Sequence, residues 1–346
     1  MMNMGLSVVV IGRNEGERLR QCLQSIFAMD RPRGSFEVIY VDSASTDNSV
    51  SIAHEYGAKV LQVFPERPTA ALGRNAGWRN ACGKYILFLD GDTLVDPHFA
   101  VDGLLEFERS DVAIVWGHRR EIRPEASLYN RVLDLDWIYA PGTTDFCGGD
   151  ALIRRSVLEE TGGFDEQLIA GEEPEICRRI RALGYKILHI DHAMTGHDLA
   201  MKSWRQYWRR ATRGGYAYAE VSARFRNTQM PFWEDEVRRT RIRAVLLTGI
   251  VVGGILVSAA MRVIWPFLIA VFILACLALR TAWKARWKSK DPLTLVLYGI
   301  HSHFQQIPIV WGQFQYARDC RSGQKRGLIE YKELSQKEPE RSAHHE

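Results

Sequence analysis

The sequence predicts an α/β domain, built on a mainly parallel sheet with flanking helices, followed by a helical hairpin that crosses a membrane. Two observations carry this prediction. Up to Asp90, short apolar runs of strand length alternate with helical patterns. Between residues 244 and 279, two uncharged runs, each about one membrane crossing long, are separated by Arg262. A chain of 346 residues with 46% hydrophobic content has room for both parts.

Four short apolar runs in the N-terminal part have the composition of buried strands. They cover residues 6–11, 36–41, 59–64 and 85–89. Helical patterns follow the first two runs, one over residues 19–26 and another starting at Ser51. This alternation predicts a mainly parallel sheet with helices on both of its faces.

The fourth run ends in two carboxylates, Asp90 and Asp92, which are separated by Gly91. In open α/β sheets, ligands bind beyond the carboxyl ends of the strands, so these acids lie where a site is expected. Oxygen ligands favour Mg²⁺ or Mn²⁺, and such an ion offsets the charge of a departing nucleotide diphosphate. Taken alone, the segment is equally compatible with an ordinary Asp-Gly-Asp turn.

Several further segments, taken in order, resemble the motifs of the family 2 glycosyltransferases over roughly residues 6–219. They are a strand with an Asn-Glu turn (8–17), an Asp-Ser-x-Ser-x-Asp loop (41–49), an Arg-Asn-x-Gly segment (74–77), the Asp-x-Asp strand (88–93), two glycine turns (148–151 and 162–165) and an acidic helix start (171–177). The resemblance implies the GT-A fold and a nucleotide-sugar donor. A Gly-rich phosphate loop does not follow the first strand, which argues against a dehydrogenase or a nucleotidyltransferase.

The resemblance also implies roles for individual residues. The donor-binding residues would be Asn14, Glu15, Asp42, Arg74, Asn75, Asp90, Gly149, Asp150 and Arg209. Asp92 and Asp90 would bind the metal, with His197 as a further candidate ligand. Two simpler interpretations remain open: Asp42 as a helix or turn cap, and His197 as an ordinary polar residue.

Inverting attack by a sugar hydroxyl requires a carboxylate opposite the leaving group to take the proton. Glu173 is the first candidate for this base, and Glu172 is the second. The family usually has Glu-Asp at this point, whereas this chain has Glu-Glu, so the choice between them is open. The alternative is that both are simply favourable first-turn acids of a helix that contains Pro174.

Residues 206–210 resemble the Gln-x-x-Arg-Trp motif of membrane-attached synthases in the family, with Arg210 where tryptophan is usual. Two interpretations of Arg209 have equal weight. Its guanidinium would contact the donor diphosphate, or the helix that carries it would lie on lipid headgroups.

The apolar runs predict membrane spans at about residues 244–261 and 263–279. Arginines and lysines flank the pair on both sides, so both ends are expected in the cytoplasm. A buried hairpin of a soluble protein is the alternative. No signal-peptide pattern opens the chain, and the six cysteines lack metal-ligand spacing, so we expect a cytoplasmic domain with reduced thiols. The expected location is the bacterial inner (plasma) membrane, with a multi-pass topology.

These patterns divide the chain into four predicted parts: a catalytic domain (1–230), the basic-flanked hairpin (231–290), an amphipathic interfacial helix with a return segment (291–334) and a disordered tail (335–346). Apolar residues between 293 and 314 form one helical stripe that Pro308 kinks or splits. This segment lies either in the membrane interface or against the catalytic domain.

Together these observations predict an inverting glycosyltransferase that uses Mn²⁺ or Mg²⁺ and moves one sugar from a nucleotide diphosphate sugar to a lipid-linked acceptor. Exopolysaccharide or cell-envelope glycan assembly is the implied setting. Transfer to polyprenyl phosphate and a catalytically silent membrane scaffold are the alternatives. Phospholipids are expected partners, a homo-oligomer is compatible with the sequence, and a net charge of +4 is too mild for nucleic-acid binding.

Overall fold

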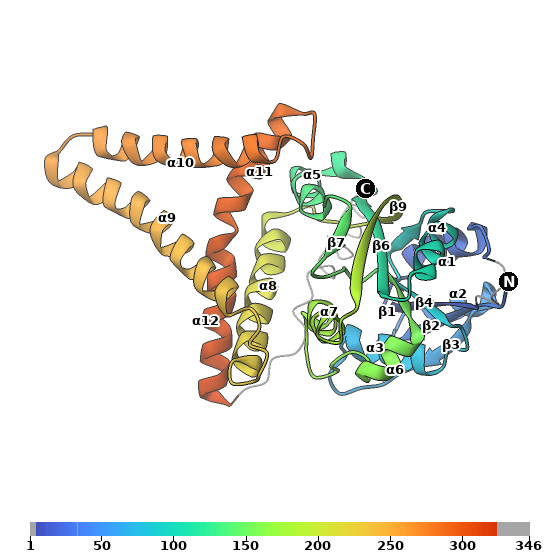
Figure 1. Cartoon of the computed structure of the whole chain (residues 1–346). Helices are drawn as coiled ribbons and strands as arrows, with labels where there is room; N and C mark the ends of the chain where they lie inside the picture. The colour runs from blue at the N-terminus through green and yellow to red at the C-terminus, as the bar shows by residue number, and fades with distance from the viewer. Residues whose placement is uncertain (1–4, 33, 324–346) are drawn as a thin grey trace, which may run out of the picture. The chain divides into compact units, whose positions relative to one another are not determined.

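The computed structural model describes residues 5–32 and 34–323, and it divides the chain into two compact units (Figure 1). The first unit contains the described residues from 5 to 122 together with 137–198. The second contains residues 123–136 and the described residues from 199 to 323. The domain limits expected from the sequence stay predictions, and the tail predicted at 335–346 lies outside the described residues.

The first unit is organised around one mixed sheet with the strand order β3-β2-β1-β4-β8-β6-β9-β5 and with β7 paired to β9. The strands are β1 (Leu6–Gly12), β2 (Phe36–Asp42), β3 (Lys59–Gln62), β4 (Tyr85–Asp90), β5 (Thr93–Val95), β6 (Val112–Glu121), β7 (Gly142–Thr144), β8 (Ala151–Arg154) and β9 (Lys186–His197). The four strands expected from the sequence form the parallel half of the sheet. Because β8 runs antiparallel between β4 and β6, the other half is mixed.

Helices alternate with the strands of this unit, which confirms the predicted α/β class. They are α1 (Glu17–Ala28), α2 (Ser49–Glu55), α3 (Ala70–Arg79), α4 (Phe99–Leu105), α6 (Arg155–Thr161) and α7 (Glu172–Ala182). Helix α1 forms because its apolar side chains recur at helical spacing, and four of them in the predicted range 19–26 are buried: Leu19, Cys22, Leu23 and Ile26. Strand β1 reads as a continuous apolar run because Val8, Val9 and Val10 are fully buried, which requires cover on both faces of the sheet.

The described residues of the second unit are helical or lie in connecting segments. The α-helices are α5 (Leu128–Asp134), α8 (Trp204–Phe225), α9 (Glu234–Met261), α10 (Trp265–Lys284), α11 (Pro292–Phe304) and α12 (Gln306–Ser322). A capping box starts α8. The backbone N–H of Gln206 donates to the Ser203 hydroxyl, and the side-chain Oε1 of Gln206 accepts from the backbone N–H of Ser203. The glutamine of the Gln-x-x-Arg motif therefore stabilises a helix start.

Helices α9 and α10 contain the two predicted spans and are long and apolar enough to cross a membrane, with 28 and 20 residues. In the most apolar 18-residue stretch of each helix, only 6% of α9 and 17% of α10 is buried inside the protein. Core helices of a soluble domain are mostly buried. The chain reverses at Arg262, whose φ is 57°. The Phe267 N–H then donates to the Ser258 hydroxyl over 2.9 Å, which ties the two helices together.

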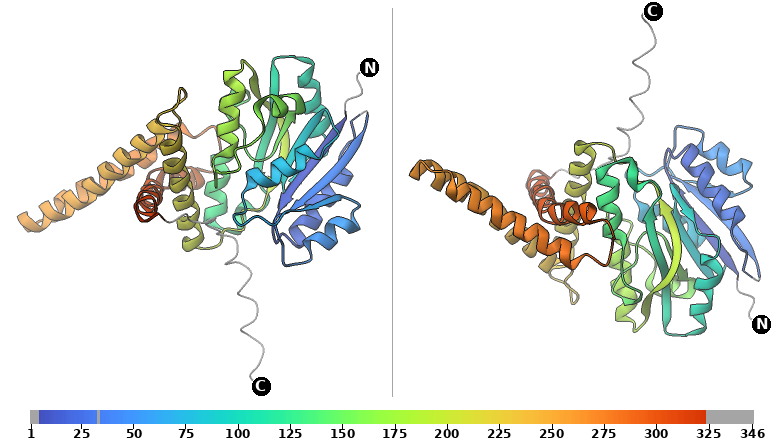
Figure 2. Two further views of the ribbon diagram at one scale, coloured as in Figure 1. Left: turned by 90° about the horizontal axis from the view of Figure 1, so that it is seen from below. Right: turned by 90° about the horizontal axis from the view of Figure 1, so that it is seen from above.

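The segment expected as one amphipathic helix is split into α11 and α12, with the break at Gln305. Pro308 lies in the first turn of α12, where a backbone N–H has no helical partner to lose. Helix α12 lies alongside α8 in every view (Figures 1 and 2). The packing is close because Gly312 of α12 and Gly215 of α8 face backbone atoms of the opposite helix.

Candidate active site

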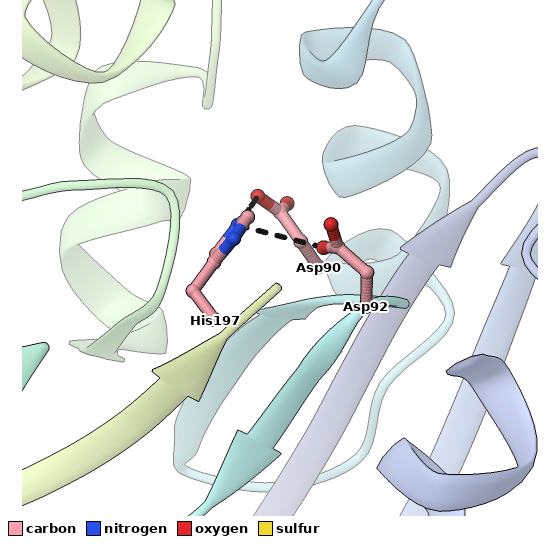
Figure 3. A group of neighbouring side chains, drawn as sticks. All are labelled: Asp90, Asp92 and His197. Carbon is pink, nitrogen blue, oxygen red and sulfur yellow. Dashed lines mark ion pairs between the residues drawn. The ribbon is translucent and has the colours of Figure 1, made fainter. Parts of the chain in front are cut away.

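The end of β4 is brought to the end of β9 by a pairing between distant strands. After Asp90 the chain turns through Gly91 and Asp92 into β5, which runs antiparallel to β9 and pairs Thr93 with His197. His197 Nε2 consequently lies 3.5 Å from Asp92 Oδ1 and 4.0 Å from Asp90 Oδ2 (Figure 3). The structure thus brings together the three metal ligands expected from the sequence.

These three side chains suit a divalent cation. One ligand atom from each lies within 4.8 Å of the others, and Asp92 and His197 are buried. Two carboxylate oxygens and an imidazole nitrogen form a donor set that Mn²⁺ or Mg²⁺ accepts. Within the described chain, His197 Nδ1 is buried without a hydrogen-bond partner, so no protein group fixes the tautomer that leaves Nε2 free. A cation between the side chains would also offset the repulsion between the two carboxylates.

Arg74, on α3, connects this cluster to the acids of α7. Its buried guanidinium donates to Glu172 Oε1 (2.9 Å) and Asp90 Oδ1 (3.1 Å), and it lies 3.4 Å from Glu173 Oε1. Burial disfavours the charged form, but attraction to the three carboxylates outweighs it and raises the pKa of Arg74. Arg74 therefore fixes the distance between the metal ligands and the candidate bases.

Gly149 allows these groups to meet. A Cβ at this position would lie 2.5 Å from an Arg74 guanidinium nitrogen, 3.2 Å from Asp90 Oδ2 and 3.3 Å from Glu173 Oε1. The position predicted as donor-binding is therefore surrounded by three of the other predicted residues, and only glycine fits without displacing them.

Asp150 is hydrogen-bonded to the strands that carry Asp90 and His197. Its carboxylate accepts hydrogen bonds from the Asp90 amide N–H (3.1 Å) and the Thr195 hydroxyl (2.8 Å). Burial, and then repulsion by Asp90, raise the pKa of the Asp150 carboxyl, although Arg119 and His197 attract it. Asp150 thus joins β4 to β9 at the point where the metal ligands converge.

The two candidate bases differ in exposure. Helix α7 begins after Gly171, whose φ of 90° favours glycine, and both acids lie in its first turn. The Glu172 side chain is 6% exposed, whereas that of Glu173 is 21% exposed. Since a base must reach its substrate, exposure favours Glu173, and its catalytic role stays a prediction.

The loops that follow β1 and β2 are joined by hydrogen bonds. The Asn14 N–H donates to the Ser45 hydroxyl (2.9 Å), and the Thr46 N–H donates to Asn14 Oδ1 (2.8 Å). Asp42 is fully buried, and it accepts from the Tyr40 hydroxyl (3.1 Å) and the Ser45 N–H (2.9 Å). This geometry supports the capping role that the sequence left open for Asp42, and its direct contact with a nucleotide stays a prediction.

Three other predicted donor residues have different surroundings. Glu15 pairs with Arg18 over 2.9 Å, and its amide donates to the Ser49 hydroxyl. Asn75 is fully buried and bonds to the 164–166 segment and to Trp78, so its amide supports the fold. Arg209 lies on α8 in the second unit. The donor contacts of all three stay predictions.

Two residues of this site were not identified from the sequence. The Arg119 guanidinium, on β6, lies 5.3 Å from the centre of the Trp137 ring, and that ring lies 5.1 Å from the His197 ring. Neither belongs to a motif. The available signal was the apolar run at 112–116, which marks a strand, and Arg119 follows it as one of a polar group.

Two family models and several known proteins are similar to this chain. The family model "Glycosyl transferase family 2" matches residues 7–162, and "Glycosyl transferase family group 2" matches residues 85–284. "Probable glycosyltransferase YdaM" of Bacillus subtilis is 27% identical over 60% of this chain and 54% of its own length. "Poly-beta-1,6-N-acetyl-D-glucosamine synthase" of Staphylococcus epidermidis is 22% identical over 55% of this chain and 49% of its own length. The chain thus spans about half the length of these curated relatives.

A solved structure has the same fold. The mannosyltransferase PcManGT of Pyrobaculum calidifontis, in complex with GDP-Man and Mn²⁺, aligns with a TM-score of 0.58 at 21% identity, over 91% of this chain and 87% of that one. The family matches span most of the first unit, and one of them extends into α10. This chain belongs to glycosyltransferase family 2 and has a GT-A-like fold.

Proposed function

We propose that the protein is an inverting, divalent-metal-dependent glycosyltransferase that moves one sugar from a nucleotide diphosphate sugar to a lipid-linked acceptor. One arrangement carries this proposal: Asp90 of the candidate metal cluster and Glu173 share the Arg74 guanidinium, at 3.1 and 3.4 Å. The candidate diphosphate binder and the candidate proton acceptor would therefore lie on either side of one guanidinium.

The protein groups have separate tasks in this reaction. Asp90, Asp92 and His197 would hold the cation, which when bound offsets negative charge on the nucleotide diphosphate leaving group. Glu173 accepts the proton of the acceptor hydroxyl while that oxygen bonds to the anomeric carbon and the bond from that carbon to the diphosphate oxygen breaks. Arg74 positions Glu173 through charge, and Glu172 holds Arg74 in place.

Helices α9 and α10 support a location at a membrane, because both are long enough to cross one and little of their apolar surface is covered by protein. We propose two crossings, with the catalytic unit on the cytoplasmic side of a bacterial inner membrane. A lipid-linked acceptor then shares a plane with the enzyme. This is the setting of exopolysaccharide or cell-envelope glycan assembly.

A transfer assay with the detergent-purified full chain tests this function. A panel of UDP- and GDP-sugars is supplied with and without Mn²⁺, using membrane lipid extract as acceptor. We expect Mn²⁺-dependent product from the wild type, loss of at least about 100-fold in Glu173→Gln with nucleotide binding retained, and loss of both transfer and metal-dependent nucleotide binding in Asp92→Ala.

The matched control is Glu159→Gln, which neutralises an exposed carboxylate on α6 that pairs with Arg155. It should transfer sugar as well as the wild type. Binding of no nucleotide by the wild type would contradict the proposal. A Glu173→Gln variant with full activity would show that Glu173 is not the base.

A further inference from the structure

Two buried cysteines of the first unit are in contact. Cys147 lies in the loop between β7 and β8, Cys177 lies on α7, and their sulfur atoms are 3.5 Å apart. The two residues are 4% and 0% exposed. A small movement would bring the sulfurs within bonding distance. Neither thiol has a task in the proposed reaction.

The cysteine pair lies next to the candidate base. Cys177 follows Glu173 by four residues, so the two side chains lie on the same face of α7, one turn apart. Cys147 precedes Gly149 by two residues, and a Cβ on Gly149 would lie 3.3 Å from Glu173 Oε1 and 2.5 Å from an Arg74 nitrogen. The loop and the helix therefore approach each other at two levels, beside Glu173 and at the two thiols.

The loop that carries Cys147 gives a small oxidant a route to the thiols. Residues 145–148 form no helix or strand, and Phe146 is 41% exposed. In the closed loop, the hydrogen bond with Cys177 and then burial raise the pKa of the Cys147 thiol, which leaves little of the reactive thiolate. Because the loop must open locally first, we expect the pair to react more slowly than the exposed thiol of Cys82.

We propose that Cys147 and Cys177 form a reversible disulfide in the presence of hydrogen peroxide, and that this bond lowers the activity of the enzyme. One thiolate attacks a peroxide oxygen and becomes a sulfenic acid as the O–O bond breaks, and the released hydroxide takes up the proton that the thiol had lost. The second thiol attacks this sulfur, the S–S bond forms, and a second water leaves with the thiol proton. The two sulfurs lose two electrons, which the peroxide gains.

The disulfide would disturb the site because the loop and α7 are already closely packed. It draws the sulfurs together from 3.5 Å to about 2.05 Å, whereas Gly149 leaves no space for a Cβ toward Arg74 and Glu173. The candidate base and the arginine beside it must then shift, and a displacement of about 1 Å can cost about 100-fold in rate. The loss of activity rests on the proposed function, whereas the bond does not.

Mass spectrometry of this chain in detergent tests the bond. Exposed thiols are first blocked with N-ethylmaleimide, peroxide is then added, and the protein is digested with trypsin without a reductant. Trypsin releases Cys147 on the peptide 132–154 and Cys177 on the peptide 156–178, and each peptide has a single cysteine. We expect one linked species, lighter than the sum of the two peptides by two hydrogen atoms, which dithiothreitol separates.

Transfer assays on the same samples test the consequence. We expect peroxide to lower wild-type transfer at least about tenfold, and dithiothreitol to restore it. Cys177→Ala should match the wild type before peroxide and keep its activity within about twofold afterwards, and Cys147→Ser should do the same. Cys82→Ala is the matched control, because it removes an exposed thiol of the same unit, and it should stay as sensitive as the wild type.

The proposal is overturned if peroxide yields no linked peptides from the folded wild type, if they form without a loss of transfer, or if Cys177→Ala loses as much activity as the wild type. Failure of the proposed function gives a different result. The reduced wild type then transfers no sugar and binds no nucleotide with Mn²⁺, while the peptides still show whether the disulfide forms. Thermal unfolding of each variant shows whether it is folded.

Discussion

At the scale of single residues, three acids of the site are arranged around one buried arginine, Arg74. Three carboxylates surround the Arg74 guanidinium, which is 2% exposed. Removing one partner of a buried ion pair leaves the others uncompensated, and this costs more than the pair itself contributes. The same arginine therefore holds the site and stabilises the fold.

We predict that Arg74→Gln lowers the free energy of unfolding by about 3–5 kcal/mol, because the buried Glu172 and the partly buried Asp90 and Glu173 lose their counter-charge. Arg79→Gln is the control on the same helix: Arg79 is 51% exposed, and its pair with Glu166 should contribute less than about 1 kcal/mol. Denaturant unfolding followed by tryptophan fluorescence measures both. Equal losses in the two variants would mean that Arg74 stabilises the fold no more than a surface pair does.

The second unit contains a titratable contact of its own. His301 Nε2 lies 3.2 Å from Asp136 Oδ2, and His301 Nδ1 lies 2.8 Å from the Tyr207 hydroxyl. Burial acts to raise the pKa of Asp136, but the hydrogen bond and charge of His301, with the attraction of Arg210, lower it overall. The charged or titratable groups around Asp136 are His301, Arg210, Tyr298, Tyr207 and Lys288.

A lowered carboxyl pKa gives stability that is fully present above the unfolded-state pKa of about 3.9 and is lost as the pH falls through the folded-state value. We therefore predict that Asp136→Asn costs about 1 kcal/mol at about pH 7, and that this difference from the wild type shrinks below about pH 4. Guanidinium unfolding at both pH values measures it. A difference that grows toward low pH would have the wrong sign.

At the scale of elements, helix contacts in the second unit depend on glycines. A Cβ on Gly215 of α8 would lie 1.9 Å from the Ile309 carbonyl oxygen of α12, so the two backbones could not approach as they do. The neighbouring Gly214 has open space around its Cβ position. The same helix thus offers one glycine that packing requires and one that it does not.

We predict that Gly215→Ala destabilises the protein by about 1–3 kcal/mol, because the contacted atom is backbone and cannot rotate away. Gly214→Ala should be neutral or stabilise by up to about 1 kcal/mol, the helix-propensity difference between glycine and alanine. Thermal unfolding in detergent compares the pair. Similar behaviour of the two variants would mean that α8 and α12 are not closely packed.

The sequence predicted individual helices and strands better than it predicted the contacts between them. The four N-terminal strands, the two apolar helices and the split near Pro308 follow from local patterns. The contact between Asp92 and His197 depends on β5 pairing with β9, which no local pattern encodes. Arg119 lies in no motif, and the complete burial of Asp42 and Asn75 could be seen only once the loops were packed.

At the scale of the whole molecule, the account of this family 2 glycosyltransferase depends on one cluster of candidate metal ligands in the first unit. Asp90 and His197 end two strands, Asp92 lies in the turn after β4, and one ligand atom of each lies within 4.8 Å of the others. The central claim is that this cluster binds a divalent cation together with a nucleotide diphosphate.

The most direct test is a Mn²⁺ titration of this chain by electron paramagnetic resonance, with and without UDP or GDP, in the wild type and in Asp92→Ala. We predict that wild-type protein with one of the nucleotides removes Mn²⁺ from the free pool well beyond what that nucleotide binds alone. Asp92→Ala should reduce this binding at least about tenfold. If Mn²⁺ binding were equal in the two proteins, Asp90, Asp92 and His197 would not form the metal site, and the donor diphosphate would have to be bound elsewhere.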